Sequence, residues 1–176
     1  PLEPDEIARL LQAAEKDDYC NLFIVAMFTG MRQGEVCGLQ WECVDFDNGT
    51  ILIDKQLQSL RGKVRGDKEK YALVPTKNGK ERTITAAPYI MEMLQKTKQT
   101  QDSYKKEFGA EFKDSGLVFT DEIGNRVTPQ ALYRAFKLVV TELDMKNVRF
   151  HDLRHSYAVV SLKSGDDVKT VQEKLG

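Results

Sequence analysis

The sequence has few residues of the kinds that bind metals or form disulfides. It contains three cysteines and two histidines among 176 residues, and Cys20, Cys37 and Cys43 do not have metal-ligand spacing. Cys20 and Cys37 lie among apolar residues, which indicates reduced cysteines in the core of a cytoplasmic protein. No glycine-rich nucleotide-binding loop is present either. We therefore expect neither a metal nor a cofactor.

Long apolar runs, repeats and linkers are also missing. No stretch reaches membrane-spanning length and no signal peptide is recognisable, which predicts an intracellular protein without a membrane partner. A chain of 176 residues is long enough for one sizeable core. We therefore expect a single domain over residues 1–176.

Excess positive charge is absent from the chain as a whole but not from its middle. The net charge is −1, which argues against a protein that coats nucleic acid indiscriminately. Residues 1–53 carry ten acids and three bases, whereas residues 54–82 carry nine bases and four acids. A polyanionic partner should meet the middle segment. The simpler alternative is a solvated hairpin with ordinary surface lysines.

Hydrophobic periodicity predicts an α+β fold that is mainly helical, with a small antiparallel sheet. Helices are expected over residues 4–14, 22–28, 89–98, 129–143, from 150 onward, and 168–175. Residues 99–114 are expected to be a frayed or an extended helix. Strands are expected near residues 50–53, 71–74, 82–85 and 117–119, and a loop or hairpin tip over 57–70. Because Asn78-Gly79 separates two β-prone runs, it predicts a hairpin with Lys77 at its tip.

The stretch from Arg149 to Ala158 contains both histidines of the chain. In a helix, residues three and four apart are neighbours, so His151, Arg154 and His155 would share one face. An apolar stripe on the adjacent face would anchor the helix; its members are Leu153, Tyr157 and Val160. The alternative is a surface helix whose histidines and arginine have no common role.

A second cationic feature is Arg32, which follows the helix expected over 22–28 and its C-cap, Gly30. A long cation at such a half-buried junction requires an anion or a carboxylate. Glu35, three residues later, is the simplest internal partner. With Lys77 and the histidine helix, Arg32 would suit a phosphodiester, because guanidinium groups bind phosphate oxygens and lysine can protonate a leaving alkoxide.

Four motifs that contain these residues resemble those of a known family. In order and spacing they resemble the tyrosine recombinases, or phage-type integrases, and especially the integrases of conjugative transposons. They are Thr29-Gly30-Met31-Arg32-Gln33-Gly34-Glu35 with Leu39-Gln40-Trp41, Thr76-Lys77-Asn78-Gly79-Lys80-Glu81-Arg82, His151-Asp152-Leu153-Arg154-His155, and Leu175-Gly176. The resemblance implies a DNA breaking-rejoining fold and site-specific recombination of a mobile element or prophage through a 3′-phosphotyrosyl intermediate.

The resemblance also implies a role for each site residue. Arg32 and Arg154 would bind the non-bridging oxygens of the scissile phosphate, and Lys77 would protonate the leaving 5′ oxygen. His151 would be the general acid/base partner or an additional ligand of a phosphate oxygen. Glu35 and His155 would not bind the phosphate themselves but would hold the site residues in position. Cations that would contact DNA are Lys55, Arg61, Lys63, Arg65, Lys80 and Arg82.

In the family, the Leu-Gly pair is followed by a further site residue and then by the nucleophilic tyrosine. Neither follows Gly176 here, so we expect a catalytic-domain fragment without its nucleophile or N-terminal DNA-binding domains. Such a fragment should be monomeric, bind double-stranded DNA weakly and fail to cleave it. The full-length protein should form a tetramer on paired DNA sites.

Three other functions stay open at this stage. A type IB topoisomerase or a telomere resolvase would share the arginine, lysine and histidine set. A non-catalytic DNA-binding module would use its cations only to release counterions. A helical domain with internal ion pairs would leave Arg32, Lys77, His151 and Arg154 scattered in space.

Overall fold

The computed structural model describes residues 2–60, 71–145 and 147–163. The chain divides into two compact units, residues 1–33 with 130–176 and residues 34–129. Each unit is described by itself, and the single domain expected from the sequence stays a prediction. The helix expected over 168–175 lies outside the described residues. Every described helix is too short or too polar to cross a lipid bilayer.

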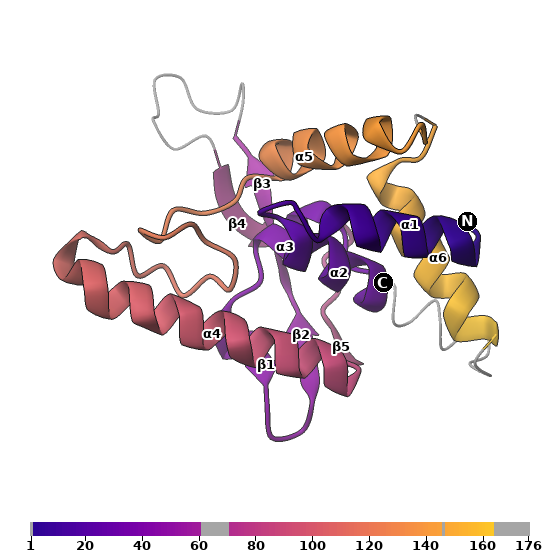
Figure 1. Cartoon of the computed structure of the whole chain (residues 1–176). Coiled ribbons are helices and arrows are strands. Elements are labelled where there is room, and N and C mark those ends of the chain that lie inside the picture. Colours follow the sequence, from indigo (N-terminus) through magenta and orange to yellow (C-terminus); the bar gives the residue numbers. More distant parts are fainter. Residues whose placement is uncertain (1, 61–70, 146, 164–176) are drawn as a thin grey trace. The chain divides into compact units, whose positions relative to one another are not determined.

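The described part of the first unit is helical, and Figure 1 labels its helices. They are α1 (Pro4–Ala14), α2 (Cys20–Thr29), α5 (Pro129–Glu142) and α6 (Phe150–Lys163). Helix α2 packs against both α1 and α6. It is buried from Leu22 to Met27, as its uniform hydrophobicity predicts, although Phe28 is 42% exposed at its end.

An aromatic cluster joins three helices of this unit. The ring of Phe136 from α5 lies 6.0 Å from that of Phe23 in α2 and 5.4 Å from that of Phe150 in α6, both in edge-to-face geometry. The N-terminal segment is tied to α6 as well, because the backbone N–H of Leu2 donates to Ser156 Oγ at 3.0 Å. The start of α6 is therefore held in a well-packed core.

The second unit contains the short helix α3 (Gln33–Cys37), two antiparallel sheets and the long helix α4 (Pro88–Phe108). The strands are β1 (Val44–Asp45), β2 (Thr50–Ile53), β3 (Lys55–Ser59), β4 (Tyr71–Pro75) and β5 (Arg82–Thr85), and short 3₁₀ turns occupy Trp41–Cys43 and Gly109–Glu111. One sheet has the order β1-β2-β5 and the other pairs β3 with β4. The mainly helical α+β class predicted from the sequence is confirmed, with two small sheets in place of one.

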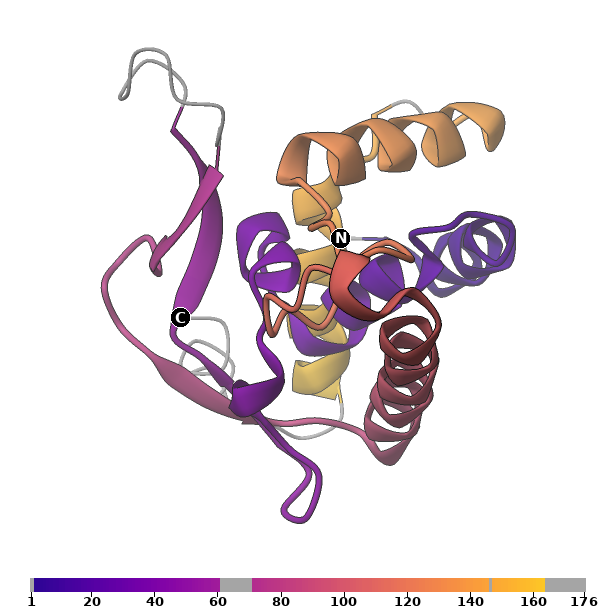
Figure 2. The same cartoon turned by 90° about the vertical axis from the view of Figure 1, so that its left-hand side faces the viewer.

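The hairpin predicted around Asn78-Gly79 is wrong. β4 pairs with β3 and β5 pairs with β2, so the two strands that flank the turn do not pair with each other. The register changes from Lys55 opposite Pro75 to Ile53 opposite Arg82, so residues 76–81 are an insertion opposite Asp54 alone. Figure 2 shows this connection leaving the ribbon between β4 and β5. Pairing of β5 with β2 places Ile84 beside Ile51 in the core, and this burial determines the register.

Helix α4 continues to Phe108, which agrees with the extended helix that the sequence allows after residue 98. A buried amide helps to hold this extension in place. The side chain of Gln101 accepts a 2.7 Å hydrogen bond from Trp41 Nε1 and donates to the carbonyl of Leu117 at 3.0 Å. Residues 117–119 are buried as expected, but they form only an isolated bridge between Leu117 and Gln40 rather than a strand.

Two glycines bring α3 and the residue that follows it against β3. A Cβ at Gly34 would lie 3.0 Å from the carbonyl oxygen of Leu57, and one at Gly38 would lie 2.8 Å from its backbone nitrogen. Only glycine allows this approach, because the backbone of a paired strand cannot move aside.

We expect Gly38→Ala to lower the free energy of unfolding by about 1–3 kcal/mol, through overpacking against Leu57. Urea denaturation should show a lower midpoint at an unchanged m-value. Gly49→Ala is the control: nothing lies within 4 Å of a Cβ there, so its positive φ is the source of an expected cost of about 1 kcal/mol. Equal stability of Gly38→Ala and the unchanged chain would contradict the tight approach.

Candidate functional site

The Thr29-Gly30-Met31-Arg32 sequence forms the C-terminal turn of α2. Gly30 has a φ of 72°, the left-handed conformation that ends a helix, as the sequence predicts. The hydroxyl of Thr29 donates to the carbonyl of Val25 at 2.5 Å and accepts from the N–H of Met31 at 3.3 Å. The turn is therefore held from both sides, and it places the half-buried Arg32 directly after the buried Met31.

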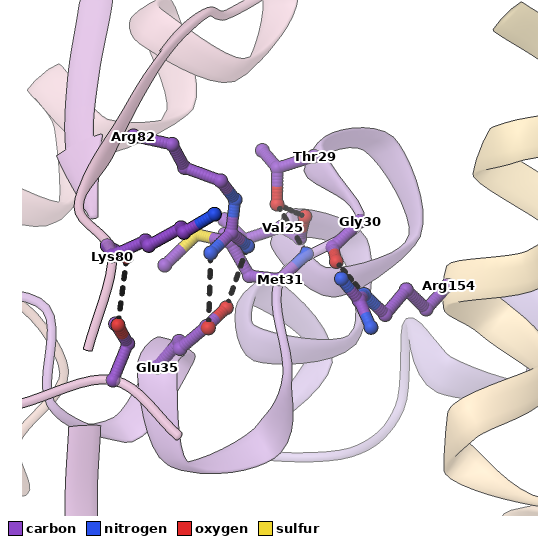
Figure 3. Close-up of polar contacts among 9 residues, drawn as sticks. Val25, Thr29, Gly30, Met31, Glu35, Lys80, Arg82 and Arg154 are labelled. Atoms are coloured by element: carbon purple, nitrogen blue, oxygen red, sulfur yellow. Dashed lines mark hydrogen bonds and ion pairs between the residues drawn. The ribbon is translucent and has the colours of Figure 1, made fainter. Parts of the chain in front are cut away.

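Arg154 of α6 is attached to this turn. Its Nε donates a 2.8 Å hydrogen bond to the carbonyl oxygen of Gly30 (Figure 3). The two residues are 124 positions apart in the sequence. The structure thus brings the guanidinium of Arg154 to the backbone two residues before Arg32, and both arginines belong to the first unit.

The other members of the predicted helix face lie on the first two turns of α6. His151 and His155 are exposed, and their ring centroids are 4.4 Å apart in edge-to-face geometry. Leu153 is fully buried, which confirms its anchoring role, whereas the side chains of Tyr157 and Val160 lie outside the described residues. The shared face of His151, Arg154 and His155 is therefore present.

The pKa of His151 is lowered from its usual 6.5, first by partial burial and then by the neighbouring His155 and Arg154, against a smaller opposite effect of Asp152. The imidazole is consequently neutral at neutral pH. A neutral imidazole can accept a proton from a hydroxyl nucleophile.

In the second unit, Glu35 of α3 is bound by Arg82 of β5 (Figure 3). Arg82 Nη1 lies 3.0 Å from Glu35 Oε1, and Nη2 lies 2.7 Å from Oε2. The side chains are 6% and 0% exposed. This bidentate pair gives Glu35 a partner other than the one that the sequence suggested, Arg32. It also overturns the prediction that Arg82 contacts DNA, because its guanidinium is buried against a carboxylate.

Lys77 stands on the exposed part of the inserted segment 76–81. Thr76 at its base is buried, its hydroxyl donates to the carbonyl of Lys80 at 2.8 Å, and the N–H of Gly79 donates to the carbonyl of Thr76 at 2.8 Å. Lys77 and Lys80 are both exposed. The local fold thus presents an ammonium group on a short, hydrogen-bonded turn.

The structure describes only one of the four remaining cations that were predicted to contact DNA. Lys55 Nζ lies 3.1 Å from Asp54 Oδ2, and this hydrogen bond raises the pKa of Lys55. Arg61, Lys63 and Arg65 lie outside the described residues. Over the part of the chain that is described, no group of three or more His, Cys, Asp or Glu side chains could hold a metal ion.

Sequence reasoning missed the Arg82–Glu35 pair, although one signal was present. Arg82 and Ile84 are alternate residues of β5, and both are buried, while Thr83 and Thr85 between and after them are exposed. Strand alternation therefore places Arg82 on the core face, where a charge requires a partner.

The whole chain, residues 1–176, matches the phage integrase family. It is 28% identical to a tyrosine recombinase XerC-like protein of Caldanaerobacter subterraneus subsp. tengcongensis and 24% identical to the ICEBs1 integrase of Bacillus subtilis. Each match covers 98% of this chain and 46% of the relative. The chain thus spans about half the length of these curated relatives.

Solved structures share the fold at lower identity. The Tn1549 transposon integrase in complex with transposon right end DNA has a TM-score of 0.80 at 19% identity, covering 99% of this chain and 57% of that one. The XerA recombinase has a TM-score of 0.68 at 23% identity, covering 99% and 55%.

The imidazole of His151 should titrate with a midpoint below 6.5 in the folded chain. His155→Asn should move this midpoint upward, because it removes a neighbouring positive charge. NMR titration of the imidazole signals measures both values, and the chain's two histidines make assignment simple. Arg134→Ala, an exposed arginine of α5, is the control and should leave the midpoint unchanged. A midpoint at or above 6.5 in the unaltered chain would contradict this expectation.

Breaking the buried ion pair from one side should be costly. Arg82→Met leaves the Glu35 carboxylate buried without its cation, and we expect it to lower the free energy of unfolding by about 3–5 kcal/mol. The double variant Arg82→Met/Glu35→Leu removes both charges and should recover most of that loss. Urea unfolding of the single and double variants tests the coupling; additive losses would show that the two side chains do not depend on each other.

Proposed function

Because this chain belongs to the phage integrase family, we propose that it is the catalytic domain of a site-specific DNA recombinase that integrates and excises a mobile element. The observation that carries the proposal is the attachment of Arg154 to the Gly30 carbonyl, next to the turn that bears Arg32. Guanidinium groups fixed by the backbone suit a phosphate oxygen better than flexible ones, because less reorganisation is needed on binding.

Arg32 and Arg154 bind the two non-bridging oxygens of the scissile phosphate and stabilise the charge that develops there. A tyrosine oxygen attacks phosphorus, and the neutral imidazole of His151 accepts the tyrosine proton. The bond from phosphorus to the 5′ oxygen breaks, and the ammonium of Lys77 gives its proton to that oxygen. The products are a 3′-phosphotyrosyl ester and a 5′ hydroxyl. None of the tyrosines of this chain is proposed as the nucleophile.

The phosphotyrosyl ester conserves the energy of the broken phosphodiester, so rejoining to a second strand requires no nucleotide and no metal. Double-stranded DNA is the proposed partner; the Tn1549 integrase complexes contain circular intermediate DNA or transposon right end DNA. Two cations of the second unit, the exposed Lys80 and the half-buried Lys55, supply attraction to the phosphate backbone. We propose a tetramer on paired DNA sites for the whole protein, and the cytoplasm as its location.

The proposal is tested with the gene product that carries this chain and a suicide DNA substrate, whose nicked strand releases a short fragment after cleavage. We expect a covalent protein–DNA adduct on denaturing gels. Arg154→Ala should slow its formation about 10²–10³-fold, as expected for loss of a donor that stabilises developing oxyanion charge. Arg134→Ala, which alters an exposed arginine of α5, should change the rate less than threefold.

The result also separates the alternatives. DNA binding without any adduct, with equal effects of the two arginine substitutions, would indicate a non-catalytic DNA-binding module. Relaxation of supercoiled DNA without a partner site would indicate a topoisomerase.

A further inference from the structure

The turn that carries Lys77, residues 76–81, is anchored at both ends by paired strands. Before it, Pro75 pairs with Lys55; after it, Arg82 pairs with Ile53. Only Asp54 lies between those two partners, so the ends of the turn are brought close while six residues loop out. The position of Lys77 is thus determined by how these two ends are held.

The end after the turn is held by more than the strand. Arg82 is its first residue beyond the insertion, and its guanidinium makes two hydrogen bonds to Glu35, at 3.0 and 2.7 Å. Both side chains are almost completely buried. A planar bidentate contact fixes the direction of the guanidinium as well as its distance, and a single ammonium–carboxylate contact does not.

The backbone around Glu35 is held in place by close packing of α3 against β3. Glu35 lies on α3 between Gly34 and Gly38, the two positions where the chain approaches the backbone of Leu57 in β3. The carboxylate therefore cannot follow Arg82 if that strand shifts. Within the second unit, the Lys77 turn leads into β5, Arg82 of β5 binds Glu35 of α3, and α3 packs against β3. Because β3 pairs with β4, the strand before the turn, this series of contacts returns to the turn.

We propose that Arg82 is a positioning residue for Lys77, and that its bond to Glu35 holds the Lys77 turn in the orientation from which the ammonium donates its proton. This inference rests on the proposed function, in which Lys77 protonates the leaving 5′ oxygen. Arg82 does not touch the DNA in this role. Loss of the bond should therefore impair proton donation selectively and leave binding of the phosphate oxygens intact.

A substrate with sulfur in place of the bridging 5′ oxygen separates proton donation from every other step. A thiolate leaves without protonation, since the pKa of a thiol lies far below that of an alcohol. The whole gene product is assayed on oxygen and sulfur substrates of one sequence. Arg82→Lys keeps the charge but not the bidentate contact, and should lose about 10–100-fold on the oxygen substrate and less than threefold on the sulfur substrate.

Lys77→Ala should show the same pattern, and Arg154→Ala should lose activity on both substrates. Gln101→Leu is the structural control, because it disrupts a buried network of the same unit that does not include Glu35. It should act equally on the two substrates. Circular dichroism at the assay temperature establishes that each variant is folded, and Arg82→Met/Glu35→Leu serves as a second test if Arg82→Lys is not.

Equal losses on both substrates for a folded Arg82 variant, or no loss on either, would overturn the positioning role. Failure of the unaltered protein to form an adduct with either substrate would instead reject the proposed function. The two failures are therefore distinguishable in one experiment.

Discussion

The hydrogen bond from Arg154 to the Gly30 carbonyl is the contact on which the proposed role of the first unit depends. It exists because Gly30 adopts a left-handed conformation, with a φ of 72°, which ends α2 and exposes the carbonyl to a neighbouring helix. The Thr29 hydroxyl reinforces the same turn. A helix end that needs an external donor and a guanidinium that needs a fixed acceptor are thus satisfied by one bond.

The buried pair of the second unit uses the same chemical group for a different purpose. Arg82 is enclosed with Glu35, and its charge is neutralised inside the protein. Arg154 is half-buried and bonded through Nε to a backbone carbonyl oxygen. Burial and the nature of the acceptor, more than residue type, therefore distinguish a structural arginine from one suited to a phosphate.

Much of the fold could be predicted from the sequence because it depends on local patterns. Apolar spacing predicted the helix at Pro4–Ala14, and glycine chemistry predicted the end of α2 at Gly30; both are confirmed. The tyrosine-recombinase fold that the motifs imply is confirmed by the solved relatives. Strand pairing was not predictable in this way, since Asn78-Gly79 signals a turn but does not specify which strands pair on either side of it.

The candidate site was predictable in part for the same reason. The face of His151, Arg154 and His155 follows from helix geometry, but the attachment of Arg154 to Gly30 joins residues 124 positions apart and leaves no periodic trace. Arg82 was misassigned because its charge was weighed without its place in the strand alternation. The roles of these residues in DNA cleavage stay predictions.

The inserted segment 76–81 also bears on how such a protein can change over time. The strand before the segment, β4, pairs with β3, and the strand after it, β5, pairs with β2. Neither register involves the segment, which lies opposite Asp54 alone. Residues can therefore be gained or lost within the turn while Ile53 still faces Arg82 and Lys55 still faces Pro75. The length of the Lys77 turn is therefore independent of the strand pairing that flanks it, so evolution can lengthen or shorten the turn without changing the two sheets.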